Sequence, residues 1–189
     1  MSQSLQRIPI IYPFNLLTIF LAFIFLVVSC SPNESIDGIN EPNAVISTSE
    51  STALKAMNNW EEQVTLLTQK MTRFKNHQVA LAQGWDEDLT GYVSNMGHHF
   101  ANWDKIDGEF NLLEPEALLY IPGDDGKMEF VGVEYLVLME LMDDPSTPPE
   151  GFIGDTDVWA IVGPFWTLHA WVGKKNPNGV FSAMNPDVD

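Results

Sequence analysis

Three separate segments of the chain place histidine or glutamate among apolar neighbours. His98 and His99 stand side by side in MGHHFANWD (96–104), and the protein has only four histidines. Glu134 lies within EFVGVEYLVLM (129–139), and His169 lies within FWTLHAWV (165–172). Imidazole and carboxylate groups bind divalent transition metals, and they also carry protons in general acid–base chemistry. These side chains are therefore the candidates for a functional site.

Glu134 and His169 need partners if their segments are strands. Side chains of a strand alternate between two faces, so Glu134 would share one face with Phe130, Gly132, Leu136 and Leu138. His169 would likewise share a face with Phe165, Thr167 and Trp171. A buried carboxylate costs several kcal/mol unless it meets a cation, hydrogen-bond donors or a proton. The two residues are either a structural pair or two arms of one site.

A transition-metal site would require a third ligand, and the histidine pair is its obvious source. If the segment is extended, His98 and His99 point to opposite faces, so at most one of them joins a site on the sheet. The chain contains no HExxH, CxxC or GxSxG motif. The sequence therefore names ligand candidates without naming a reaction.

The first 49 residues have a different character from the rest. An apolar run of about 15 residues, too short for a permanent membrane span, ends in VVSC at residues 27–30 and predicts a signal peptide over residues 1–29. VVSC resembles a bacterial lipobox, which implies that Cys30 is lipidated. Ser31 then implies sorting to the outer membrane. Residues 30–49 are rich in Ser, Asn, Pro and acids, which indicates a flexible tether. The alternative is a plain secretory signal or membrane anchor with an incidental cysteine.

Residues 50–189 are predicted to form a single α+β domain. Apolar residues at steps of three and four between 54 and 81 predict a long amphipathic helix that ends near Gly84, with His77 facing solvent. Segments 116–121 and 129–139 flank an Asp125-Gly126 turn and predict a β-hairpin. Residues 158–173 predict one or two further strands, divided at Gly163-Pro164. The expected fold is a long N-terminal helix packed on an antiparallel sheet.

The charge of the chain argues against nucleic-acid partners. The formal net charge is −17, and nearly all of it falls after residue 30. Such a surface repels phosphate backbones, which proteins bind by displacing counterions with Lys and Arg. The membrane is expected to be contacted through the lipid on Cys30, and the sequence does not identify a protein partner. Asp124-Asp125 is read as part of a turn rather than as a calcium site, because the spacing is not that of an EF-hand.

Six short motifs occur in order along the second half of the chain. They are G-x-H-[aromatic]-x-N, PEALLY, VGVEY, LH-x-W, NP-x-G-x-F and a final NP, at residues 97–102, 115–120, 131–135, 168–171, 176–181 and 185–186. Together they resemble an uncharacterised family of exported bacterial proteins, over residues 90–188. The resemblance implies no reaction, because no activity is established for that family.

The resemblance does imply a choice of residues. In the family pattern one histidine directly precedes the aromatic residue, and it corresponds to His99. The position that His98 occupies is not usually a histidine in that pattern. The polar residues that match the family pattern are then His99, Glu134 and His169, one from each of three segments. Asn102 and Glu116 also match the pattern and are expected to orient an imidazole.

Two functions remain open from the sequence. The first is a lipid-anchored envelope protein with a small pocket in which His99, Glu134 and His169 bind a divalent metal ion or a polar ligand. Chemistry there would use metal-activated water or Glu134 as a general base. The second is a non-catalytic structural or interaction lipoprotein in which the same three residues form a buried hydrogen-bond network. Converging ligand atoms beside a cleft would favour the first function, and direct His–Glu hydrogen bonds in a closed core would favour the second.

Overall fold

The computed structural model describes residues 48–189, with side chains from Ser51 onward, and its fold is α+β. The helices are α1 (Thr48–Ala56), α2 (Trp60–Met71), the 3-10 helix η1 (Thr72–Lys75), α3 (His77–Ala82) and two later 3-10 turns, η2 (Trp103–Lys105) and η3 (Met139–Leu141). The strands are β1 (Glu87–Asp88), β2 (His98–Ala101), β3 (Ala117–Pro122), β4 (Met128–Leu138), β5 (Ala160–Val162) and β6 (Phe165–Ala170). The predicted signal peptide, Cys30 and the tether up to residue 47 lie outside the described residues.

The single long helix expected before Gly84 is instead a series of shorter helices. Asn59 is extended and caps α2, because its side chain accepts a hydrogen bond from the Glu62 amide. Asn76 is extended too, and it caps α3 by accepting from the Gln78 amide. Asparagine side chains compete with the helix for backbone groups, so they favour caps over helix interiors. No helix in residues 48–189 has both the length and the apolar character that crossing a membrane requires.

The restart at Asn76 also changes the position of His77. The expected solvent-facing histidine is half-buried, with its ring 4.6 Å from the ring centroids of both Phe100 and Tyr120. The predicted orientation of His77 assumed one continuous helix, and it is wrong because α3 begins at His77 with a new register.

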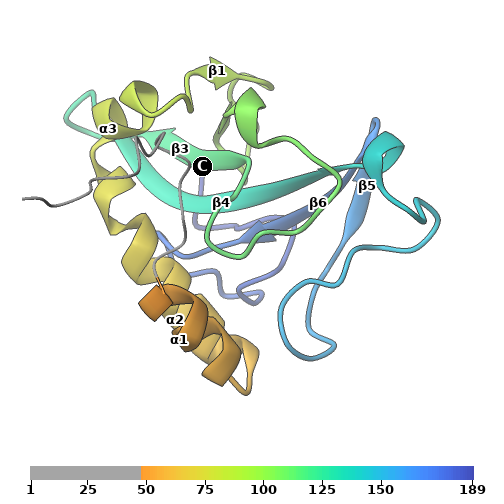
Figure 1. Ribbon diagram of the computed structural model, residues 1–189. Helices are drawn as coiled ribbons and strands as arrows, with labels where there is room; N and C mark the ends of the chain where they lie inside the picture. The colour runs from red at the N-terminus through yellow and green to blue at the C-terminus, as the bar shows by residue number, and fades with distance from the viewer. Residues whose placement is uncertain (1–47) are drawn as a thin grey trace, which may run out of the picture. The chain divides into compact units, whose positions relative to one another are not determined.

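Six strands form one antiparallel sheet in the order β1-β2-β3-β4-β6-β5. The predicted hairpin is confirmed as β3 and β4, and Gly126 in its turn has a φ of 76°. The segment 158–173 contains β5 and β6, which pair across Gly163-Pro164 as the sequence indicates. Figure 1 shows the long β4 curving through the sheet, with α1, α2 and α3 on one side of it.

A β-bulge in β4 changes which residues share a face. Leu119 pairs with Gly132, but the next residue of β3, Tyr120, pairs with Phe130, so Val131 is an extra residue in β4. Simple alternation put Phe130 on the face of Glu134, and this was wrong. Phe130 packs in the helix-covered core, whereas Val131 belongs to a smaller cluster with Leu119. A bulge also bends its strand and increases the local twist.

The helices cover the face of the sheet opposite to Glu134. Leu67, Met71 and Phe74 are buried against Tyr120 and Tyr135. The Tyr120 hydroxyl donates to the carbonyl of Phe74 at 2.7 Å, which ties the helical segment to β3. Every buried hydrophobic residue that the structure describes lies between positions 67 and 188, so a chain beginning at Ser31 retains the whole of this core.

Gly97 fixes the start of β2, and its replacement has a predictable cost. Gly97 has a φ of 87°, and a Cβ added there would lie 2.5 Å from the Tyr120 carbonyl oxygen. Gly126 has a similar φ of 76°, but no heavy atom lies within 4 Å of its Cβ position. Both alanine variants incur the left-handed backbone cost, and only Gly97→Ala adds a clash. Urea unfolding should show Gly97→Ala less stable than Gly126→Ala by about 1–3 kcal/mol. Equal stabilities would contradict this role.

Candidate metal site

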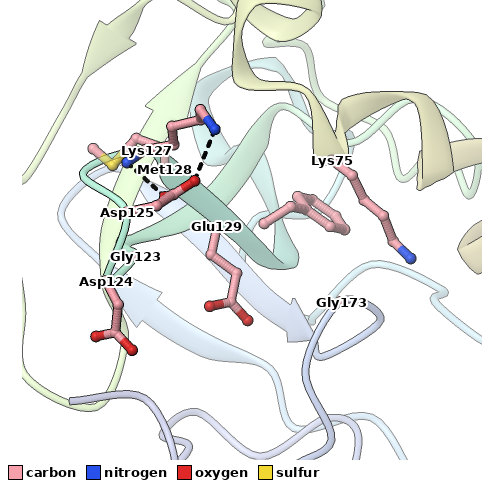
Figure 2. A pocket seen from close by; sticks show the side chains of 9 residues that line it. Lys75, Gly123, Asp124, Asp125, Lys127, Met128, Glu129 and Gly173 are labelled. Atoms are coloured by element: carbon pink, nitrogen blue, oxygen red, sulfur yellow. Dashed lines mark hydrogen bonds and ion pairs between the residues drawn. The ribbon is translucent and has the colours of Figure 1, made fainter.

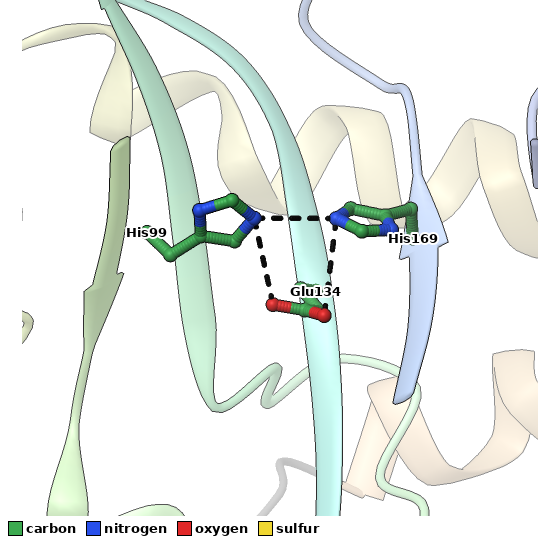
Figure 3. A group of neighbouring side chains, drawn as sticks. All are labelled: His99, Glu134 and His169. Carbon is green, nitrogen blue, oxygen red and sulfur yellow. Dashed lines mark hydrogen bonds and ion pairs between the residues drawn. The ribbon is translucent and has the colours of Figure 1, made fainter. Parts of the chain in front are cut away.

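His99, Glu134 and His169 meet on the face of the sheet that the helices leave uncovered (Figure 3). They come from β2, β4 and β6, and as whole residues they are only 3%, 7% and 6% exposed. The two imidazole Nε2 atoms are 3.3 Å apart. Glu134 Oε2 lies 3.7 Å from His99 Nε2, and Glu134 Oε1 lies 3.8 Å from His169 Nε2.

The register of the strands explains how residues on β2 and β6 come together. Glu134 pairs with His169 on β6 and with Ala117 on β3. His99 on β2 pairs with Leu119, two residues along β3 from Ala117. In a flat sheet, β2 and β6 would lie about 14 Å apart, since three strand spacings separate them. The two imidazole side chains span this separation, because they point toward one another over Glu134 (Figure 3).

The separations suit a metal ion with three protein ligands. In a tetrahedral site with bonds of about 2.0–2.1 Å, ligand atoms lie about 3.3–3.4 Å from one another. The observed 3.3, 3.7 and 3.8 Å are close to these values. Both His–Glu distances exceed ordinary hydrogen-bond lengths. The three buried residues can therefore hold a metal ion, with a fourth position open.

A threonine fixes which nitrogen of His99 has the lone pair. The Thr90 hydroxyl lies 2.9 Å from His99 Nδ1 and donates its proton to the Gly91 carbonyl oxygen at 2.8 Å. Because a hydroxyl has one proton, Thr90 must accept from Nδ1–H of a neutral His99. The lone pair then lies on Nε2, which faces the other two residues. This is the usual second hydrogen bond of a metal-binding histidine.

Burial favours the neutral form of all three groups when no metal is bound. It lowers the pKa of His99 to about 4 and that of His169 to about 3, and it raises the pKa of Glu134 to about 8. The charge of Asp88 raises the pKa of His99, and a hydrogen bond with Thr167 lowers the pKa of Glu134, but both effects are smaller than burial. The imidazoles thus present free lone pairs at neutral pH, whereas Glu134 must lose a proton to bind a cation.

A cavity of about 520 Å³ opens above these three residues. Its polar lining consists of Thr90, His99, Glu134, Thr167 and His169, and every other residue that lines it is apolar. The volume lies within the range of small-molecule sites, which are mostly apolar with a few convergent polar groups.

His98 takes no part in the site. It points to the other face of β2, where its Nδ1 lies 2.8 Å from Asp88 Oδ2. The expectation that the two histidines separate across the strand is thus confirmed, and the histidine pair is no chelate.

Asn102 and Glu116 lie elsewhere than the sequence suggested. Asn102 donates to the Gln83 carbonyl and accepts from the Asp104 amide, so it caps η2. Glu116 is fully buried, accepts from the Leu136 amide, and has a pKa raised to about 8 by burial. Both contact backbone groups rather than an imidazole, because strand alternation turns them away from His99 and Glu134. Thr90 holds the orienting position instead. No sequence motif marked it, since it lies nine residues before His99.

Another cavity, of about 610 Å³, lies at the β3–β4 turn (Figure 2). Asp125 accepts from the Lys127 amide and pairs with its Nζ at 2.8 Å, and both side chains are exposed. These contacts of Asp125 are those of a turn, as the sequence indicated.

Comparison of this chain with protein-family models, with curated proteins and with solved structures found no match. The function is therefore inferred from the geometry of the site itself.

Thr90 gives a test of how the site is oriented. Thr90→Val removes the hydroxyl that fixes the His99 tautomer, and loss of such a partner typically weakens metal binding about 10–100-fold. Thr90→Ser keeps the hydroxyl and should bind metal like the wild type. Competition against a fluorescent zinc chelator measures both. Equal affinities of the valine and serine variants would show that Thr90 does not orient His99.

Proposed function

We propose that this is a lipid-anchored cell-envelope protein whose His99, Glu134 and His169 side chains bind one divalent transition-metal ion. The observation that supports the proposal is the convergence of three buried ligand groups, with all ligand atoms within 4.8 Å of one another, at a cavity. Two imidazoles and one carboxylate suit zinc, iron(II) and neighbouring ions, and they disfavour calcium and magnesium, which prefer all-oxygen sites.

The number of protein ligands distinguishes a structural metal site from one that binds a further ligand. Structural zinc sites have four protein ligands, whereas sites that act on a ligand keep a position for water or substrate. Here the three protein ligands would leave that position open toward the cavity that they line. A bound metal would supply a Lewis acid there, and the chain's own residues would hold and orient it.

A buried hydrogen-bond network is the competing function. The 3.3 Å contact between the two Nε2 atoms supports it, because His169 Nε2–H can donate to the lone pair of His99 in the absence of metal. The two functions differ in metal content.

Elemental analysis of residues 31–189 distinguishes them. The protein is stripped with chelator, exposed in turn to zinc, iron(II), manganese and calcium, and desalted. We expect about one zinc or iron ion per chain and no retained calcium. Chains that retain none of these ions would contradict metal binding and leave the network as the function.

The envelope address has a separate test. Cys30→Ala should abolish labelling of the full chain by radioactive palmitate and release the protein from the membrane fraction. Unchanged labelling would show that VVSC is not a lipidation site.

A further inference from the structure

In the cavity above the metal site, the polar side chains gather at the metal site and the remaining lining is apolar. His99, Glu134 and His169 form the site itself, Thr90 bonds to His99, and Thr167 bonds to Glu134. Every polar side chain of the lining therefore belongs to the site or contacts it directly, and the rest of the lining is apolar. A ligand that fits this cavity has one polar group at the metal and an apolar remainder.

The charge of the loaded site selects the polar group. A divalent ion, one carboxylate and two neutral imidazoles sum to a single positive charge in a buried position. Among the described residues that line the cavity, none is Lys or Arg, and Glu134 is the only acid. An anionic oxygen donor on the ligand would neutralise the remaining charge, which is costly to leave unpaired away from water.

The rim of the cavity is apolar too. Trp103, Val158 and Val162 line it and are 52%, 50% and 60% exposed. Apolar side chains exposed together beside a pocket are typical of a binding surface for an apolar ligand. Val162 belongs to the short edge strand β5, so this part of the rim is the free edge of the sheet.

We propose that the cavity binds an apolar monocarboxylic acid, with the carboxylate on the metal held by His99, Glu134 and His169 and the aliphatic tail along the apolar lining. This inference rests on the metal-binding function proposed above. It adds the chemical class of the ligand, which metal binding alone does not specify.

Calorimetric titration of zinc-loaded residues 31–189 with straight-chain acids from acetate to decanoate tests the inference. The zinc content of each sample is measured first, so that failure of metal binding is seen separately. Each added methylene should tighten binding about fourfold until the tail fills the cavity, because it buries more apolar surface. Zinc-free protein should bind the same acids more weakly at every chain length.

Two neighbours on β5 provide a matched pair of variants. Ala160 lines the cavity, whereas Ile161 is outside the lining and 58% exposed. Ala160→Phe should retain zinc, but its affinity for the acids should no longer increase with their chain length. Ile161→Phe should behave as the wild type. Ala183→Phe narrows the cavity from another segment and replaces Ala160→Phe if that variant does not fold.

Three results would overturn the inference. Protein that holds zinc but binds acetate and decanoate equally has no pocket for the tail. Equal binding to zinc-loaded and zinc-free protein means that the carboxylate is not on the metal. Protein that retains no divalent transition-metal ion contradicts the proposed function, and the inference is lost with it.

Discussion

Replacing His169 with alanine is expected to weaken metal binding by about two to three orders of magnitude. Structural zinc sites with four ligands bind with about 10–16 kcal/mol, which corresponds to about 2.5–4 kcal/mol for each ligand. His169 supplies one of only three ligand groups, and its Nε2 lies 3.3 Å from that of His99. His99→Ala should have a loss of similar size, because the two imidazoles are equivalent in the site.

The matched control is His98→Ala. It removes the histidine next to His99 in the chain, but His98 is on the other face of β2 and pairs with Asp88. Its metal affinity should equal that of the wild type in the same chelator competition. If His99→Ala and His169→Ala lower only the free energy of unfolding and leave the affinity unchanged, the three residues are a structural network.

Metal affinity is expected to rise about fifty-fold between pH 6 and pH 8, from the loss of one proton. Burial raises the pKa of Glu134 to about 8, so its carboxyl is largely protonated below that pH and the metal must displace the proton. The pKa values of His99 and His169, lowered to about 4 and 3, leave both rings neutral throughout this range. The affinity should therefore rise with pH and level off only above pH 8.

Zinc titrations at pH 6, 7 and 8, and calorimetry in two buffers of different ionisation enthalpy, measure this dependence. Glu134→Gln should bind more weakly and show no rise, because an amide has no proton to lose. A pair of ordinary exposed histidines would behave differently, with an affinity that levels off above pH 7. Such a profile in the wild type would contradict the buried Glu134 as a ligand.

Local sequence signals predicted the strands in the second half of the domain but not β1. The hairpin of β3 and β4 and the division of β5 from β6 both follow from apolar runs that end at Gly and Pro. Glu134 and His169 also followed from local reasoning, since polar residues in apolar strands need partners, whereas the choice of His99 rested on the family resemblance. The separation of His98 from His99 needed only strand alternation.

The remaining features depend on contacts that a local pattern does not contain. The bulge at Val131 is set by how β3 and β4 pair, and it moved Phe130 to the helix-covered face. Asn59 and Asn76 cap the starts of α2 and α3 inside one continuous apolar stripe, because capping by asparagine competes with propagation of a single helix. Thr90 approaches His99 through a loop, so no spacing rule could identify it.

The location of a metal ion in the folded protein is the most direct test of the account. Crystals of residues 31–189 loaded with zinc, measured on both sides of the zinc absorption edge, give that location by anomalous scattering. We expect one peak at about 2.0–2.2 Å from His99 Nε2, His169 Nε2 and a Glu134 oxygen. Zinc-loaded crystals with no anomalous peak between these three side chains, and with the two Nε2 atoms still in direct contact, would contradict the account.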